Sequence, residues 1–100
     1  MKKVIINTDD FGVNLPRSKG ILKAIEQGAA TSTTAMVAFD DFDESMNLIP
    51  KDFSFGLGIH LQGAGRCSPL IRTHKTLSRG DGMFWPKHDM RSKLLSGEID

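Results

Sequence analysis

Three side chains of types that bind cations and move protons stand out in this chain. Asp9 and Asp10 are adjacent, and His60 lies much further along the sequence. An acidic pair can supply a general base and a cation ligand, and imidazole with carboxylate is a common ligand set for zinc and other divalent ions. Together, these residue types could serve a metal-assisted reaction. The ordinary alternatives are a solvated acidic turn and a buried, hydrogen-bonded histidine.

The remaining candidate ligands are less well placed. A catalytic zinc typically takes three protein ligands and leaves the next position to water. His74 and His88 are candidates for the third ligand, but both lie in a glycine-rich stretch and show no ligand spacing. Cys67 is the sole cysteine, which excludes an intrachain disulfide and a cysteine-based zinc cluster.

Strand and helix signals alternate around these residues. Residues 3–8 form a β-branched apolar run, typical of a strand buried on both faces. Residues 9–16 read as a loop, and helical spacing then runs from Pro16 to a stop at Gly28. The other expected elements are strands at 31–39 and 53–61, a helix capped by Asp40 or Asp41 with Met46 and Ile49 facing inward, a long loop at 62–89, and a last helix at 90–95.

This order of elements predicts an α/β fold built from parallel βαβ units with right-handed crossovers. Ligands gather at the carboxyl ends of strands in such sheets. The acidic pair follows the first predicted strand, and His60 ends the third. Three parallel strands leave two sheet edges open, so we interpret residues 1–100 as a single domain that forms the N-terminal portion of a longer barrel.

Charge and hydropathy limit the classes of molecule that this chain is expected to bind. The chain has 13 basic and 12 acidic residues, a net charge of +1, so no strong field would attract nucleic acid or an anionic membrane. No apolar run approaches the roughly 20 residues of a membrane span. The short run at 4–6 falls below the roughly 7–15 residues of a secretory signal. We expect a cytoplasmic protein acting on a neutral substrate, with a homo-oligomer left open.

Several motifs together resemble one known family. They are Asn7-Thr8-Asp9-Asp10-Phe11-Gly12, Gly20-Ile21, Gly28 followed by Thr31-Ser32-Thr33, Met36-Val37 and Gly56-Leu57-Gly58-Ile59-His60-Leu61. In order and spacing they resemble the YdjC-type carbohydrate deacetylases. A weaker similarity follows at Ser68-Pro69 and Gly82-Met83-Phe84.

The resemblance implies a distorted (β/α) barrel related to the polysaccharide deacetylases. It also implies a divalent metal ion, magnesium or zinc, and hydrolysis of the acetyl group from an N-acetylated amino sugar or oligosaccharide. Carried over residue by residue, Asp9 is the base, while Asp10 and His60 are metal ligands. The order within the acidic pair rests on analogy with related deacetylases.

Aromatic residues are the candidate substrate contacts. Phe84 and Trp85 follow the turn residues Gly80-Asp81-Gly82, and Phe11 adjoins the acidic pair. Aromatic faces can stack against the apolar faces of sugar rings. For Phe84 and Trp85, anchoring of the loop by hydrophobic burial is the stronger alternative.

Departures from the family keep other functions open. Family members are longer and carry a downstream Asp-x-His-x-His-like segment that nothing here matches. Thr8 replaces the usual alanine, and Ser18 stands where asparagine is common. One alternative is a non-catalytic fragment or sugar-binding remnant of the same fold. Another is a receiver-like phosphoacceptor module, which would need an aspartate where this chain has His60.

Overall fold

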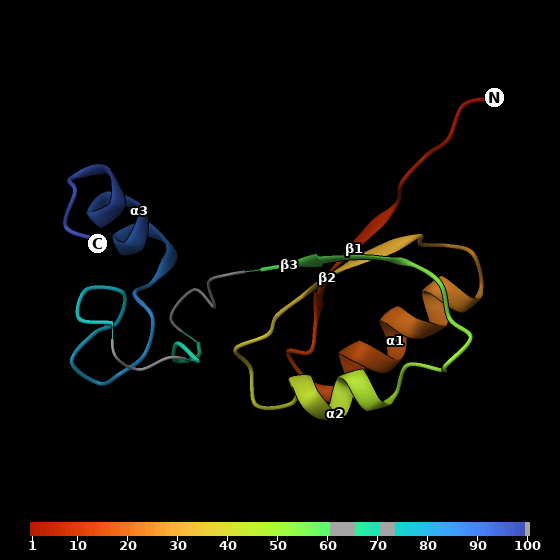
Figure 1. The fold of residues 1–100 in the computed structure, drawn as a ribbon, viewed down its shortest axis with the longest axis horizontal. Helices are drawn as coiled ribbons and strands as arrows, with labels where there is room; N and C mark the ends of the chain where they lie inside the picture. Colours follow the sequence, from red (N-terminus) through yellow and green to blue (C-terminus); the bar gives the residue numbers. More distant parts are fainter. Residues whose placement is uncertain (61–65, 71–73, 100) are drawn as a thin grey trace. The chain divides into compact units, whose positions relative to one another are not determined.

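The computed structural model describes residues 1–60, 66–70 and 74–99, and the chain divides into two compact units, Met1–Leu61 and Gln62–Asp100. The first unit contains three strands and two helices (Figure 1). Along the chain they are β1 (Asn7–Phe11), α1 (Leu15–Glu26), β2 (Ser32–Ala35), α2 (Phe42–Asn47) and β3 (Gly56–Ile59).

The three strands form one parallel sheet in the order β1-β2-β3, which confirms the predicted α/β fold of βαβ units. β2 and β3 are shorter than predicted, but the ladder continues beyond them, because the His60 N–H donates to the Ala35 carbonyl at 2.9 Å. Leu61, the predicted end of the third strand, lies outside the described residues.

The first strand differs from its prediction in position and burial. It spans Asn7–Phe11, so the acidic pair lies within β1 and not in a loop after it. Val4 and Ile5 are 73% and 80% exposed, whereas the sequence pattern predicts burial on both faces. The prediction is wrong here because β1 is an edge strand of this sheet, and its register with β2 begins only at Asn7.

A β-bulge at the acidic pair sets the orientation of β1. Thr8 pairs with Thr33 and Phe11 with Ala35, so three steps along β1 oppose two along β2. Asp10 has a φ of 71°, and the extra residue turns Phe11 to the same face as Thr8. Without the bulge, strict alternation would place Asp10 opposite Ala35 and direct a carboxylate into the core.

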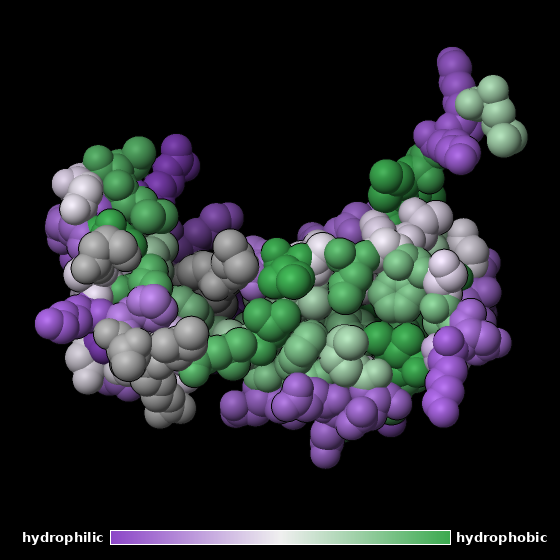
Figure 2. Space-filling view, viewed as in Figure 1, coloured by the Kyte–Doolittle hydropathy of each residue, from purple (hydrophilic) through white to green (hydrophobic). Residues whose placement is uncertain are grey.

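The hydrophobic core lies between the sheet and the two helices, which cover one face of the sheet (Figure 1). Hydrophilic side chains line the outer side of α1 and α2, and hydrophobic ones gather between these helices and the sheet (Figure 2). The buried members are Phe11, Ile21, Leu22 and Ala35, with Ile25, Val37, Phe42, Leu48 and Ile49 packed against them. The opposite face of the sheet carries polar residues.

The two predicted signals of α1, Pro16 at its start and Gly28 after its end, are confirmed, and the structure adds an N-cap. Asn14 caps the helix, with its Oδ1 accepting from the Arg17 N–H at 2.9 Å, and Pro16 lies in the first turn. Gly28 follows the helix with a φ of 73°, a left-handed conformation that glycine adopts without steric cost.

The second helix is oriented differently from its prediction. Asp41 is the N-cap, but its carboxylate accepts from the Leu15 N–H of α1 at 3.2 Å. Met46, expected to face inward, is 37% exposed, and Ser45 is the buried residue of this short helix. Ile49 lies just beyond α2 and packs against the core, as predicted.

Ser45→Ala is expected to lower the free energy of unfolding by about 1–3 kcal/mol. Ser18 and Ser45 are both fully buried, and the Ser18 hydroxyl donates to Ser45 Oγ at 2.8 Å. The substitution removes the acceptor of the buried Ser18 O–H group. Urea unfolding followed by circular dichroism measures the effect, with the exposed Asn47→Ala in the same helix as control. Equal stability of the two variants would contradict the argument.

The second unit contains α3 (Lys87–Leu95), which begins three residues before its predicted start at 90. Pro86 occupies the N-cap position in an extended conformation, so the helix can begin directly after it. The described residues between 66 and 86 form no named strand, in agreement with the loop prediction; they contain one antiparallel bridge between Ser78 and Phe84. Among the described residues, no helix has the length and apolar character needed to cross a membrane.

Candidate functional site

The polar face of the sheet holds Asp9 in a small hydrogen-bonded network. The Asn7 amide donates from Nδ2 to Asp9 Oδ1 at 3.1 Å and to Thr34 Oγ1 at 3.1 Å. The Ser32 hydroxyl donates to Asn7 Oδ1 at 2.7 Å. Asn7 therefore orients one carboxylate oxygen of Asp9. Asn7 was not singled out from the sequence, although its spacing of two residues from Asp9 places both side chains on one face of a strand and could have identified it.

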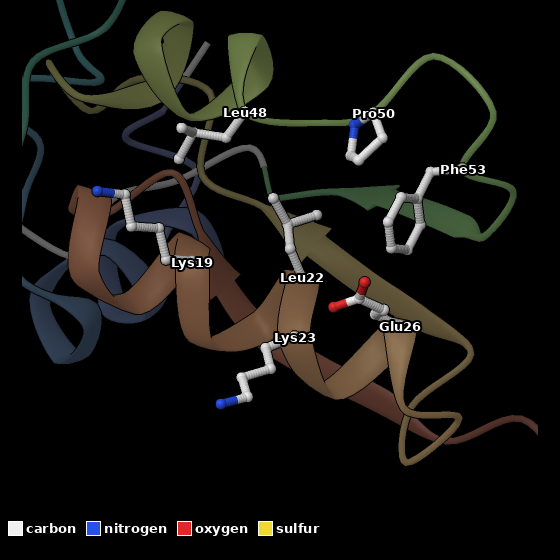
Figure 3. Close-up of a pocket in the computed structure, with 7 residues that line it drawn as sticks. All are labelled: Lys19, Leu22, Lys23, Glu26, Leu48, Pro50 and Phe53. Atoms are coloured by element: carbon white, nitrogen blue, oxygen red, sulfur yellow. The ribbon is translucent and has the colours of Figure 1, made fainter.

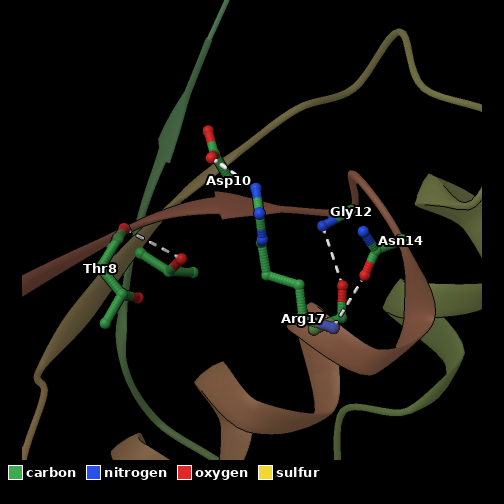
Figure 4. A network of polar contacts seen from close by, with 7 residues as sticks. Thr8, Asp10, Gly12, Asn14 and Arg17 are labelled. Atoms are coloured by element: carbon green, nitrogen blue, oxygen red, sulfur yellow. Dashed lines mark hydrogen bonds and ion pairs between the residues drawn. The ribbon is translucent and has the colours of Figure 1, made fainter.

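Asp10 makes a different set of contacts. Its Oδ2 accepts from Arg17 Nη1 at 2.8 Å, in an ion pair whose side chains are 42% and 45% exposed, respectively (Figure 4). Arg17 lies in the first turns of α1 and was not singled out from the sequence. The bulge thus keeps both carboxylates off the core face: Asp9 joins the polar network of the sheet, while Arg17 extends from α1 to Asp10.

The turn after Asp10 is fixed by a buried contact. Gly12 has a φ of 94°, and its N–H donates to Ser18 Oγ at 2.9 Å (Figure 4). Ser18 in turn contacts Ser45 of α2. Two neighbouring residues of α1, Arg17 and Ser18, therefore bind the segment on both sides of Phe11.

His60 lies on the same face of the sheet as Asp9. Its backbone continues the ladder with β2, so its side chain alternates with that of Ile59 and shares the face of Gly58 and Thr34. The side chain is exposed. Because β2 lies between β1 and β3, the strands that carry Asp9 and His60 are about 10 Å apart across the sheet, two strand spacings.

The donor types at this site suit a divalent metal ion, but their number is small. Carboxylate and imidazole are ligands for zinc and for harder cations. In the ranges 1–60, 66–70 and 74–99, no group of three or more His, Cys, Asp or Glu side chains is placed to hold a metal. His74 and His88 belong to the second unit, where the His88 side chain is 93% exposed.

The aromatic candidates occupy packed positions. Phe11 is 0% exposed in the core, so its ring offers no free face to a sugar, and its predicted substrate contact is not supported. The bulge causes this burial, because it turns Phe11 toward the helices. In the second unit, Phe84 is 6% exposed and its N–H donates to the Cys67 carbonyl at 2.9 Å, which fits anchoring of the loop.

Trp85 is half-buried and has two partners. Its Nε1–H donates to the Thr76 carbonyl at 2.9 Å, and the Lys93 ammonium lies 4.4 Å from the ring centroid. Lys93 also donates to Glu98, and this hydrogen bond, with a second from Ser96, holds the pKa of the Glu98 carboxyl below its usual range. These contacts fit anchoring by Trp85, and its sugar contact stays a prediction.

A shallow pocket of about 270 Å³ lies on the helical side of the first unit (Figure 3). It contains none of the predicted site residues, so the chemistry proposed for the polar face does not depend on it. Its lining comes from α1 and from the segment after α2: Lys19, Leu22, Lys23, Glu26, Leu48, Pro50 and Phe53.

Known proteins have sequences similar to this one. The family described as YdjC-like protein matches residues 3–99. A carbohydrate deacetylase of Clostridium beijerinckii is 37% identical over 83 residues, which cover 82% of this chain and 33% of that protein. A carbohydrate deacetylase of Brevibacillus brevis is 33% identical over 99 residues, or 98% of this chain and 39% of that protein.

A crystal structure from Enterococcus faecalis V583 shares the fold. For that protein, cleavage of cellobiose phosphate is the suggested role. The TM-score is 0.81 at 31% identity, covering 92% of this chain and 37% of that one. The chain thus spans between a third and two fifths of the length of these relatives. On the match over residues 3–99, the chain belongs to the YdjC-like protein family.

Proposed function

We propose that this chain supplies part of the active site of a metal-dependent hydrolase that removes acetyl groups from N-acetylated amino sugars or oligosaccharides. The observation that carries the proposal is the bulge in β1, which keeps both Asp9 and Asp10 off the core face and places Asp9 on the face of His60. The relatives named carbohydrate deacetylase support the reaction class and the carbohydrate substrate.

The site residues would have distinct roles. Asp10 and His60 would hold a divalent ion, magnesium or zinc. When bound, such an ion lowers the pKa of its bound water toward about 7 and polarises a carbonyl. Asp9 would accept the proton of the water that attacks the acetyl carbon. Asn7 would keep one oxygen of Asp9 occupied and so direct the other toward the open face of the sheet.

A second candidate is a non-catalytic or sugar-binding form of the same fold. It is favoured by the small set of metal-binding side chains among the described residues. In that case the polar face would bind an acetylated sugar without hydrolysing it.

Acetate release from diacetylchitobiose by the longest natural product of this gene separates the two candidates. We expect release that stops with a chelator and returns with added divalent ion. Asp9→Asn should lower kcat by roughly 10²–10⁴-fold, since it removes a general base. His60→Ala should weaken metal binding and turnover together. His88→Ala is the matched control, because that side chain is almost fully exposed in the second unit.

Two results would contradict the proposal. Turnover unaffected by complete metal removal would exclude a metal-dependent mechanism. Binding of diacetylchitobiose by metal-loaded protein without acetate release would favour the sugar-binding form.

A further inference from the structure

The carboxylate of Asp10 already has a cationic partner. Arg17 Nη1 lies 2.8 Å from Asp10 Oδ2, and Figure 4 shows the pair joining α1 to β1. Both side chains are a little less than half exposed, so ions in solution can reach the pair. A divalent cation that binds Asp10 must share this carboxylate with a guanidinium or displace it.

The position of Asp10 does not depend on Arg17. Main-chain contacts hold its left-handed conformation: the Val13 N–H donates to the Asp10 carbonyl at 3.3 Å, and the Met36 N–H donates to the Phe11 carbonyl at 2.7 Å. The bond from Gly12 to Ser18 fixes the next residue. Loss of the Arg17 guanidinium would therefore free the carboxylate without removing the backbone geometry that presents it.

Two electrostatic effects act in the same direction at this pair. Attraction between Arg17 and Asp10 stabilises the metal-free state, and repulsion between Arg17 and a divalent ion destabilises the bound state. Solvent exposure limits both, because exposed ion pairs contribute little. The combined effect corresponds to roughly a twofold to fivefold change in the dissociation constant of the metal.

We propose that Arg17 is a resident counter-ion that competes with the divalent cation for Asp10 and so sets the metal affinity of the site. The inference rests on the proposed function, since it takes Asp10 to be a metal ligand. Arg17 does not touch the reacting atoms in this role. It acts through the Asp10 carboxylate alone.

Titration of Mn²⁺, with the free ion followed by its electron paramagnetic resonance signal, tests the inference in the longest natural product of the gene. Arg17→Met should bind Mn²⁺ roughly twofold to fivefold more tightly than the wild type. Arg17→Lys, which keeps the charge, should stay closer to the wild type. Lys19→Met is the matched control, because Lys19 is an exposed cation of the same helix.

A double-mutant cycle locates the effect. In an Asp10→Asn background, Arg17→Met should no longer change Mn²⁺ affinity. Unchanged or weaker binding by Arg17→Met, equal tightening by Lys19→Met, or tightening that persists without Asp10 would overturn the inference. Wild-type affinity in Asp10→Asn alone would instead overturn the ligand role of Asp10. Weakened binding in Asp10→Asn beside an unchanged Arg17→Met would reject the counter-ion and leave the proposed function standing.

Discussion

Phe11→Ala is expected to lower the free energy of unfolding of the first unit by about 3–5 kcal/mol, the range for removal of a buried aromatic ring. Phe11 is 0% exposed and lies in the core beside Ile21, Leu22 and Ala35. The variant loses the ring's contacts and leaves a cavity. The total free energy of unfolding of a native domain is only about 5–15 kcal/mol. Urea unfolding followed by circular dichroism should therefore show a transition that is shifted to much lower urea or lost.

Ile59→Ala provides the control for this experiment. Ile59 pairs with Ala35 at the same end of the sheet but is 63% exposed. Its truncation should therefore lower the free energy of unfolding by less than about 1 kcal/mol. A small effect of Phe11→Ala, close to that of Ile59→Ala, would show that Phe11 is not a core residue. Its predicted role as a substrate contact would then regain support.

Gly12→Ala is expected to destabilise the first unit by about 2–4 kcal/mol, because backbone strain and a steric clash add. Gly12 has a φ of 94°, which side chains of L-residues rarely adopt. A Cβ atom at this position would lie 2.8 Å from Phe42 Cδ2 and 3.4 Å from Phe42 Cα. Urea unfolding of the variant and the wild type measures the difference.

Variants at two other glycines of the same unit distinguish the cost of backbone strain from the cost of the steric clash. Gly28 has a φ of 73° but open space around it, so Gly28→Ala should show the cost of strain alone. Gly20 lies inside α1, and a Cβ atom there would meet nothing within 4 Å outside its own helix. Gly20→Ala should therefore stabilise the helix by about 0.5–1 kcal/mol. Equal costs at Gly12 and Gly28 would show that the contact with Phe42 contributes nothing.

Phe11 and Gly12 also link stability to the candidate site. They directly follow Asp10, and the burial of one and the left-handed turn of the other fix where β1 leaves the sheet. A variant at either position that still folds should therefore place the Asp10 carboxylate differently. The same segment thus serves both the core and the proposed chemistry.

Local patterns in the sequence were enough for the framework of the fold. The alternation of apolar runs with helical spacing predicted the parallel βαβ units, because each signal depends on residues close together in the chain. Pro16 and Gly28, both predicted, mark the ends of α1 through short-range backbone geometry. The spacing of the strands also placed His60 at the end of β3, where the ladder with Ala35 now includes it.

The tertiary structure alone decided how the acidic pair is divided. A bulge is a difference in register between two strands, and register depends on which residues of a distant strand lie opposite. The pairing of β1 with β2 turns Phe11 into the core and Asp9 to the polar face. Residues 7–11 alone do not specify these orientations. Likewise, the packing of α1 beside β1 brings Arg17 to Asp10, and the packing of α2 against α1 brings Ser45 to Ser18. Both contacts depend on how separate elements pack, which local sequence patterns do not specify.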